Sequence, residues 1–477
     1  MKPREACGVM AVYAPGGEAS RIAYYGLFAL QHRGQESAGI AAYNGKGVSV
    51  RKDTGLVSRV FSEADIESLP GTLAIGHTRY STTGSSSVRN AQPFLVDTKH
   101  GPVAIAHNGN LINAGKIRAT LLDRGVGLSS ASDTELMLMS LAGSTGADWM
   151  ERIASAMSAW AGAFSFVVLA SDGVYAGRDP WGFRPLACGF TAEGAFAVAS
   201  ETCALSTLGC LEPMEIEPGQ IVRCDSSGAV SWLDSGCRAR AGGEARTAGS
   251  DQHESASCVF EFIYFSRPDS VWKGISVHEA RRRFGSELAK ADSLEADLVI
   301  PVPDSSISAA IGYSGESGIP YGEAFVKNRY IGRTFIEPTT FLRKRGVSLK
   351  FNVLRDAVRG KSVVMIDDSI VRGNTVRPLV SLLRQAGARE VHVRVASPPV
   401  RFPCMMGVDM GQPEDLIANR MGEAELAAWA GADSLSYLSL EAVGRALGGM
   451  RGYCAACFSG AYPLDVGISA PKDRFEF

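Results

Sequence analysis

The chain has 477 residues, of which 45% are hydrophobic and 21% charged, a composition typical of a globular protein with two or more domains. Its formal net charge of −2 gives no electrostatic reason to expect binding to nucleic acid or to an anionic membrane. No apolar run reaches the roughly 18 residues of a membrane span. The start, MKPREACGV, lacks the apolar core of a signal peptide. We therefore expect a cytoplasmic protein whose ten cysteines are free thiols, ligands or a nucleophile rather than disulfides.

Up to about residue 235 the pattern predicts short strands and turns with few long helices. Apolar or alternating runs predict strands at 8–13, 72–75, 103–107 and 164–170, and helical spacing predicts helices at 132–141 and 147–161. Residues 236–257 are polar, glycine-rich and aperiodic, and we interpret them as a linker or surface excursion between two domains. The first domain is then 7–235.

From residue 258 to the end at 477, predicted strands and helices alternate. Helices are expected at 277–292, 305–313 and 374–387, and strands at 297–302, 362–366 and 390–396. Two further helical stretches follow within 412–447. This alternation predicts a second domain built on a parallel α/β sheet, followed by a helical tail.

The strand at 362–366 is followed by two carboxylates, Asp367 and Asp368, and then by a loop of small residues that enters a helix. Ligands of open α/β sheets lie outside the carboxyl ends of the strands, and such a loop offers backbone N–H groups to a phosphate. Carboxylates beside a phosphate cradle suggest a phosphorylated sugar with a metal ion. The alternative is an ordinary helix N-cap.

The order of these parts resembles the phosphoribosyl pyrophosphate (PRPP) motif of the type I phosphoribosyltransferases. The resemblance implies that Asp367 and Asp368 hold the ribose hydroxyls and help to place Mg²⁺, with Ser305 as a further metal or pyrophosphate contact. The loop residues assigned to the 5-phosphate cradle are Ser369, Arg372, Gly373, Asn374 and Thr375.

Between the two predicted strands lies a long basic stretch, 327–352, which by charge alone is a solvated surface loop. Its sequence KNRYIGRTFI resembles a family signature for a loop that closes over PRPP and excludes water. The resemblance assigns pyrophosphate contacts to Lys327, Arg329 and Lys350. Glu337 and Thr340 stand where that family usually has glutamine.

The first half carries five further motifs in order. Together they resemble the N-terminal-nucleophile (Ntn) glutamine amidotransferase domain, which implies a four-layer αββα fold. The motifs are QHRGQESAG at 31–39, GHTRYST at 76–82, AHNGNL at 106–111, SDTE at 132–135 and RDP at 178–180.

Cys7 lies just before the first predicted strand. Taken alone, an early cysteine is more often a buried thiol. The resemblance makes it the nucleophile that attacks the glutamine amide. In that family the base is the free α-amino group of the cysteine, whose pKa near 8 suits neutral pH. This mechanism requires removal of residues 1–6 as a propeptide.

The remaining requirements of a glutaminase are an oxyanion hole and charges complementary to zwitterionic glutamine. By resemblance, Asn108 and the N–H of Gly109 form the oxyanion hole, Arg79 binds the α-carboxylate and Asp133 the α-ammonium. Thr82 and Arg33 are assigned to the lining of the same pocket. A metal site formed by His32, His77 and His107 is an alternative, but the spacing of these histidines in the sequence does not fit one.

Cys454 and Cys457 form a CxxC, and spacing alone cannot choose its partners among Cys224, Cys237, Cys258 and Cys404. Thiolate sets suit zinc or iron–sulfur. The sequence around 258–270, 397–404 and 453–458 resembles the cluster-bearing branch of the glutamine PRPP amidotransferases. That resemblance implies a [4Fe–4S] cluster on Cys258, Cys404, Cys454 and Cys457, with zinc or unligated thiols as alternatives. The last three cysteines are expected in the core: Cys188, Cys203 and Cys210.

The resemblance to this family runs from residue 7 to about 463. It implies glutamine-dependent conversion of PRPP to 5-phosphoribosylamine, glutamate and pyrophosphate, the first committed step of purine biosynthesis. It also implies Mg²⁺, a homo-oligomer that is often a tetramer, and feedback inhibition by purine nucleotides. Two rival hypotheses are a glucosamine-6-phosphate synthase, which would lack the PRPP motif, and a non-catalytic nucleotide-binding regulator, which would need no glutaminase residues.

Overall fold

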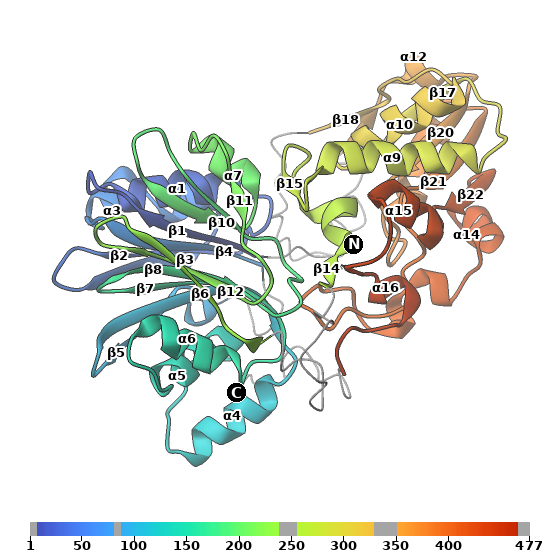
Figure 1. Ribbon diagram of the computed structural model, residues 1–477. Coiled ribbons are helices and arrows are strands. Elements are labelled where there is room, and N and C mark those ends of the chain that lie inside the picture. Colours follow the sequence, from blue (N-terminus) through green and yellow to red (C-terminus); the bar gives the residue numbers. More distant parts are fainter. Residues whose placement is uncertain (1–6, 81–86, 238–254, 329–350, 466–477) are drawn as a thin grey trace.

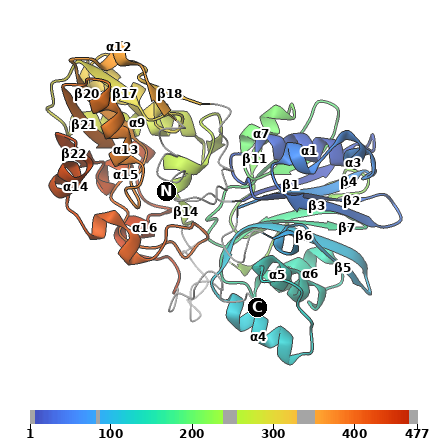
Figure 2. The ribbon, with the colours of Figure 1, turned by 180° about the vertical axis from the view of Figure 1, so that it is seen from behind.

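The computed structural model describes residues 7–80, 87–237, 255–328 and 351–465. Figure 1 shows two units lying side by side, with the first half of the chain in blue to green and the second in yellow to red. Figure 2 shows the same division from behind. The predicted linker, 236–257, lies mostly outside the described residues. In the described part of the chain, no helix is long and apolar enough to cross a membrane.

The first unit contains two antiparallel sheets. One has the strand order β11-β9-β10-β1-β4-β2-β3 and the other β13-β12-β8-β7-β6-β5. The strands of the first sheet are β1 (Gly8–Tyr13), β2 (Ser37–Tyr43), β3 (Val48–Thr54), β4 (Leu73–Arg79), β9 (Ala187–Phe190), β10 (Phe196–Ala199) and β11 (Met214–Glu215). Those of the second are β5 (Phe94–Thr98), β6 (Gly101–Leu111), β7 (Gly162–Ala170), β8 (Gly173–Arg178), β12 (Gln220–Asp225) and β13 (Val230–Asp234).

The two sheets pack face to face, and helices cover their outer faces (Figure 1). In β1, Met10 and Val12 pack toward the outer helices, whereas Val9 and Ala11 pack toward the second sheet. Both faces of the strand are therefore buried, which explains its unbroken apolar sequence. The helices of this unit are α1 (Ala19–Ala29), α2 (Val57–Val60), α3 (Glu63–Glu67), α4 (Ala114–Asp123), α5 (Asp133–Ala142), α6 (Trp149–Met157), α7 (Thr202–Thr207) and the 3₁₀ turn η1 (Val88–Asn90). The predicted four-layer αββα fold is confirmed.

The second unit is built on a parallel sheet with the order β17-β20-β21-β22. Its strands are β17 (Leu298–Pro301), β20 (Ser362–Asp367), β21 (Glu390–Val395) and β22 (Ser434–Tyr437). Helices α9 (Val277–Lys290), α10 (Ile307–Ser317) and α15 (Leu440–Leu447) cover one face, and α13 (Val376–Gln385) and α14 (Glu423–Ala430) the other. In β20, Val363 and Met365 face the second group of helices while Val364 and Ile366 face the first, so this strand is buried on both sides as predicted.

Short elements complete the second unit. They are β14 (Ser257–Cys258), the π-helix η2 (Glu261–Phe265), β15 (Val271–Trp272), β16 (Ile275–Ser276), β18 (Phe325–Lys327), β19 (Phe351–Val353), α12 (Arg355–Val358), η3 (Pro413–Asp415), η4 (Ile417–Asn419), β23 (Tyr453–Cys454) and α16 (Ala456–Ser459). The predicted strands and helices of both halves are confirmed within a few residues. The sequence analysis missed β22, a four-residue strand between the two correctly predicted helical stretches.

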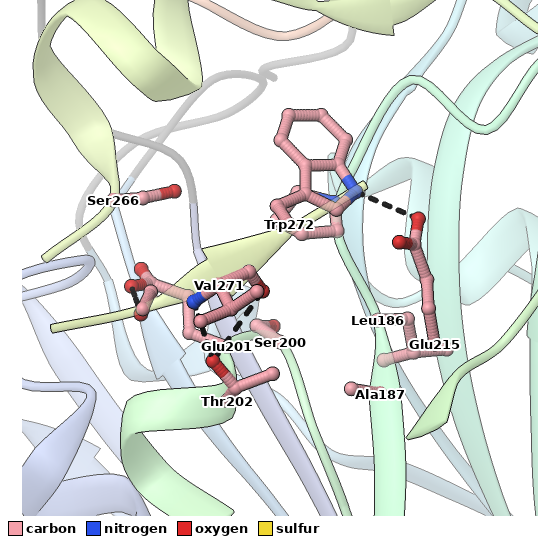
Figure 3. A pocket seen from close by; sticks show the side chains of 11 residues that line it. Leu186, Ala187, Ser200, Glu201, Thr202, Glu215, Ser266, Val271 and Trp272 are labelled. Carbon is pink, nitrogen blue, oxygen red and sulfur yellow. Dashed lines mark hydrogen bonds between the residues drawn. The ribbon is translucent and has the colours of Figure 1, made fainter. Parts of the chain in front are cut away.

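The β15–β16 hairpin lies against the first unit. Trp272 Nε1 donates to Glu215 Oε1 at 2.8 Å, and Val271 N donates to Thr202 Oγ1 at 2.8 Å (Figure 3). The cavity beside these contacts measures about 20 Å³, which is room for one water molecule. It is therefore a packing gap of the interface and too small for a substrate.

Candidate functional site

Cys7 lies immediately before β1, and the end of β4 holds its side chain. Its thiol donates to Tyr80 O at 3.2 Å, while Tyr80 N lies 3.4 Å from the sulfur as a donor. The side chain is 6% exposed, and burial raises the pKa of the Cys7 thiol, although the charge of Arg79 acts in the opposite direction. A buried thiol with a raised pKa is protonated at rest, so attack on a substrate requires a base.

Asn108 and Gly109 lie on β6, next to the end of β4. His77 of β4 joins the two strands through Nε2 and His107 O, 3.1 Å apart, and the next residue, Thr78, pairs with Gly8 across β1 and β4. The side chain of Asn108 is buried, and its Nδ2 has no hydrogen-bond partner among the described residues. An unpaired buried donor is costly, as expected where a ligand oxygen supplies the acceptor.

Asp133 begins α5, where the preceding Ser132 caps the helix. Its Oδ2 accepts a hydrogen bond from Leu111 N at 3.1 Å, two residues beyond Gly109 on β6. His107 Nε2 lies 3.6 Å from the same oxygen, and burial lowers the pKa of that histidine. A buried carboxylate thus stands beside β6, where it can pair with a cationic group.

Arg33 joins the Cys7 backbone to two buried carboxylates. Its Nε donates to Cys7 O at 3.0 Å, and its other nitrogens donate to Glu201 and, at 2.8 and 3.0 Å, to Glu261 of the second unit. The sequence analysis missed both glutamates. The available signal was chemical, because a fully buried arginine needs carboxylate partners. The assignment of Arg33 to the glutamine pocket stays a prediction, and Thr82 lies outside the described residues.

The carboxylate pair of the second unit stands at the carboxyl end of β20. Asp367 and Asp368 are both buried, and Asp368 N donates to Asp367 Oδ1 at 3.0 Å. Ser369 Oγ donates to Asp368 Oδ1 at 2.7 Å, and Ser305 Oγ, from the turn after β17, donates to Asp368 Oδ2. The turns after β17 and β20 therefore meet at one edge of the sheet, as expected from the parallel pairing of these strands.

The loop after this pair runs into α13. Gly373 adopts a φ of +75°, and Val371 O accepts a hydrogen bond from Ile417 N at 2.9 Å. Arg372 Nη2 lies 3.7 Å from Asp409 Oδ1. Asn374 is exposed and Thr375 immediately precedes α13, so the loop presents its end to solvent at a helix N-terminus, a position that favours phosphate.

Lys327, at the end of β18, forms an ion pair with Asp304 in the turn after β17. This places the lysine beside the turn after β17, which meets the carboxylate pair, and its contact with pyrophosphate stays a prediction. The other two predicted contacts, Arg329 and Lys350, lie outside the described residues, as do Glu337 and Thr340.

The four predicted ligand cysteines gather between the two units. Cys258 and Cys454 are opposite each other in the parallel pairing of β14 with β23. Cys457 belongs to the apolar core of the second unit, and Cys258 and Cys404 pack against the same core, so all four cysteines share one region. In the ranges that the structure describes, no three or more His, Cys, Asp or Glu side chains are arranged to hold a single metal ion.

The remaining cysteines are buried in the first unit. Cys224 and Cys237 belong to two separate apolar clusters of the first unit, neither of which includes any of the four predicted ligand cysteines. Those predicted to be core residues are buried as expected: Cys188, Cys203 and Cys210.

Comparisons of the sequence with known proteins all point to one class of enzyme. Residues 77–207 match a family model described as a glutamine amidotransferase domain. Curated amidophosphoribosyltransferases from Synechococcus elongatus and Archaeoglobus fulgidus are 46% and 45% identical, over 98% and 96% of this chain and 92% and 98% of their own lengths.

Two solved structures are similar over almost the whole chain. The glutamine PRPP amidotransferase from B. subtilis, complexed with ADP and GMP, is 40% identical with a TM-score of 0.88 and covers 98% of this chain and 100% of its own. A second, described as the allosteric regulatory enzyme of purine biosynthesis, is also 40% identical, with a TM-score of 0.89 and 98% coverage of both chains. Full-length identity at this level, together with both sites described above, shows that the chain belongs to the amidophosphoribosyltransferase family.

Proposed function

We propose that this enzyme uses glutamine to convert PRPP into 5-phosphoribosylamine, with release of glutamate and pyrophosphate, in the first step of purine biosynthesis. The observation that carries the proposal is the presence of two complementary sites in one chain. Cys7 and the unpaired amide of Asn108 mark a glutaminase, and the buried carboxylate pair at the end of β20 precedes a phosphate-type loop.

The first half-reaction belongs to Cys7. Its sulfur attacks the amide carbon of glutamine, and the thiol proton passes to the α-amino group of Cys7, which removal of residues 1–6 would free. The developing oxyanion accepts hydrogen bonds from Asn108 Nδ2 and Gly109 N. The protonated amine then gives its proton to the leaving ammonia, and water hydrolyses the thioester to glutamate. Asp133 and Arg79 hold the two charged ends of glutamine.

The second half-reaction takes place at the edge of the parallel sheet. Ammonia attacks the anomeric carbon of PRPP, the bond to pyrophosphate breaks, and the new amine loses a proton. Asp367 and Asp368 hold the ribose hydroxyls, while the loop 369–375 binds the 5-phosphate. Two carboxylates with a substrate's phosphate oxygens are a usual ligand set for Mg²⁺, which when bound neutralises charge on the departing pyrophosphate.

A direct assay tests the whole reaction. With both substrates present, we expect glutamate and pyrophosphate to form in equal amounts, because one ammonia displaces one pyrophosphate. Glutamate is measured enzymatically and pyrophosphate by a coupled phosphate assay, with either substrate omitted as the control. If glutamate were released at the same rate with or without PRPP and no pyrophosphate formed, the phosphoribosyltransferase activity would be excluded. The rival hypothesis of a sugar-phosphate amidotransferase would then be favoured.

Cys258, Cys404, Cys454 and Cys457 are proposed to hold a [4Fe–4S] cluster, which would tie the start, middle and end of the second unit together. Zinc on the same four thiolates is the alternative, because both a zinc ion and an iron–sulfur cluster suit thiolate ligands.

The mass of anaerobically purified protein tests both the propeptide and the cluster. Under denaturing conditions we expect a chain that begins at Cys7, and under native conditions an added mass of four irons and four sulfides. A Cys404→Ser variant is the matched control and should lose the added mass while keeping the processed terminus. A full-length chain would mean that Cys7 has no free α-amino group, which would contradict the proposed base. An added mass equal to one zinc ion would show that the four cysteines hold zinc and not the cluster.

We propose that purine nucleotides regulate this enzyme, because the B. subtilis relative was solved in complex with ADP and GMP. From the family resemblance alone, we further propose that the nucleotides inhibit it and that it works as a homo-oligomer, with a tetramer as the expected form.

A further inference from the structure

A lysine on the edge strand of the first sheet reaches across to the second sheet. Lys52 lies on β3, and its Nζ donates to Ala91 O at 2.6 Å and to Pro93 O at 3.0 Å. The same ammonium lies 4.5 Å from the centroid of the Phe94 ring, at the start of β5, which is a favourable cation–π distance. Burial lowers the pKa of Lys52 to about 8, so the group is charged at neutral pH and yet shielded from water. Its hydrogen bonds to the two carbonyls are therefore weakly screened.

The segment that Lys52 holds, residues 91–93, is tightly enclosed. All three of its residues are buried. Strand β2 approaches it so closely that a Cβ added to Gly39 would lie 2.2 Å from Gln92 O and 2.8 Å from Lys52 Cβ. The missing side chain at position 39 permits this approach, and the segment has little room to move.

The side chain of Gln92 continues the connection to β6. The pairing of β5 with β6 ends where Phe94 stands opposite Ile105, and the same register would place residue 92 opposite His107. At this point the Gln92 side chain takes the place of a strand, because its Oε1 accepts a hydrogen bond from His107 N at 2.7 Å. A buried backbone N–H that β5 does not reach is thereby satisfied.

His107 is the residue immediately before Asn108. Its carbonyl oxygen lies 3.1 Å from His77 Nε2, and its Nδ1 lies 2.7 Å from Thr134 Oγ1. Asn108 Nδ2 itself has no hydrogen-bond partner among the described residues. The position of this donor therefore depends on the backbone that carries it, which Gln92 holds at the preceding residue.

We propose that Lys52 and Gln92 are positioning residues of the oxyanion hole: Lys52 fixes residues 91–93, and Gln92 holds β6 at His107 so that Asn108 Nδ2 meets the oxyanion formed from glutamine. The inference rests on the proposed function, because it requires Asn108 to be an oxyanion donor. Neither residue is catalytic, since both act on glutamine only through the backbone of β6.

Steady-state kinetics of the whole enzyme test the proposal. Lys52→Met and Gln92→Leu should each lower kcat for glutamine hydrolysis by roughly tenfold, because a slightly displaced donor loses contact with the transition state. The KM for glutamine should stay within about twofold of the wild-type value, because the lost interaction forms only in the transition state. The ammonia-dependent reaction should be unchanged, since all of these groups lie in the first unit.

The matched control is Arg51→Met, one residue earlier on β3. Arg51 is half-exposed and pairs with Asp65 at 3.1 Å, so this change removes a neighbouring charge without touching residues 91–93. It should behave as the wild type in both reactions. A tenfold loss of kcat in this control would show that any disturbance of β3 slows the reaction, and would overturn the specific role of Lys52.

The double variant tests whether Lys52 acts through Gln92. Residues that act in series have non-additive effects, so Lys52→Met combined with Gln92→Leu should be no slower than the slower single variant. Losses that multiply to about a hundredfold would mean independent effects and would overturn the proposed series. If Lys52→Met does not fold, Gln92→Leu carries the kinetic test by itself, because it keeps the apolar packing of the segment.

Alkylation of Cys7 separates the oxyanion hole from the nucleophile. With iodoacetamide, the sulfur bonds to a saturated carbon as iodide leaves and the thiol proton passes to the buffer, so no oxyanion forms. The rate at which iodoacetamide abolishes glutamine hydrolysis should therefore be the same in the variants as in the wild type, with the site confirmed by the mass of the peptide that contains Cys7.

The outcomes separate this inference from the function on which it rests. An alkylation rate that falls in parallel with kcat would show that the substitutions disturb Cys7 itself, and an unchanged kcat in both single variants would show that neither residue matters to the reaction. Either result overturns the inference and leaves the proposed function standing. If the wild-type enzyme does not hydrolyse glutamine, the proposed function fails and the inference fails with it.

Discussion

Replacing Cys7 with alanine is expected to abolish glutamine-dependent formation of phosphoribosylamine while leaving the ammonia-dependent reaction nearly intact. The sulfur is the proposed nucleophile of the first half-reaction, and removal of a nucleophile costs at least about 10⁴-fold in rate. The carboxylate edge of the parallel sheet belongs to a different unit and does not contain this residue. The measurement is pyrophosphate release from PRPP, with glutamine or with ammonium chloride at alkaline pH.

The matched control for this change is Cys210→Ala, which removes an equally buried sulfur from an apolar cluster of the same unit. It should lower stability without selective loss of either reaction. If Cys7→Ala remained folded and yet lost the ammonia-dependent activity, the two units would not divide the chemistry as proposed.

The second large effect is expected from Asp367→Asn, which should abolish both the glutamine-dependent and the ammonia-dependent reactions. Asp367 is the last residue of β20 and is almost fully buried. The asparagine amide keeps the shape of the side chain but removes the negative charge that we propose binds the ribose hydroxyls and Mg²⁺. Since ammonia from either source must attack the same PRPP, we expect a loss of at least about 10²-fold in both assays.

Asp297→Asn provides the control, because Asp297 contacts the opposite end of β20. Asp297 Oδ2 accepts a hydrogen bond from Ser362 N at 2.7 Å, where β20 begins, so the change weakens the strand without touching the carboxylate edge. We expect a small loss of stability and normal turnover. Retention of ammonia-dependent activity in Asp367→Asn would remove this carboxylate from the transferase site.

Sequence alone predicted the parts of the fold that have a strong local signal. The unbroken apolar run of β20 predicted a strand buried on both faces, and the two carboxylates that follow it stand at its carboxyl end. The same reasoning located Cys7 before β1. These features depend on neighbours a few residues apart, and hydrophobic patterns report such neighbours well.

Contacts between distant segments left no comparable signal. Arg33 lies 168 residues from Glu201 and 228 from Glu261 in sequence, and no local pattern marks either glutamate. The packing of the loop 401–419 was also missed. Its glycines are placed by contacts with distant segments, as Gly407 is by Gly109, and they follow no repeating sequence pattern. Resemblance to a family supplied the residues that are predicted to touch substrate, but the groups that hold those residues in place required the three-dimensional structure.

The pairing of β14 with β23 has a consequence for the order in which the protein can be completed during synthesis. Ser255 Oγ donates to Gly452 O, 197 residues later. The aromatic rings at and just before η2 pack on the last described elements, with Phe260 stacked on Phe458 and Phe262 against Tyr453. The first unit leaves the ribosome early and can begin to fold while the rest is being made. Glu261 lies next to those rings in sequence and is one of the two carboxylates that pair with Arg33 behind Cys7. A chain cut short before residue 453 would leave the rings around Glu261 uncovered, so this carboxylate would be held less firmly until residues 453–459 have been made.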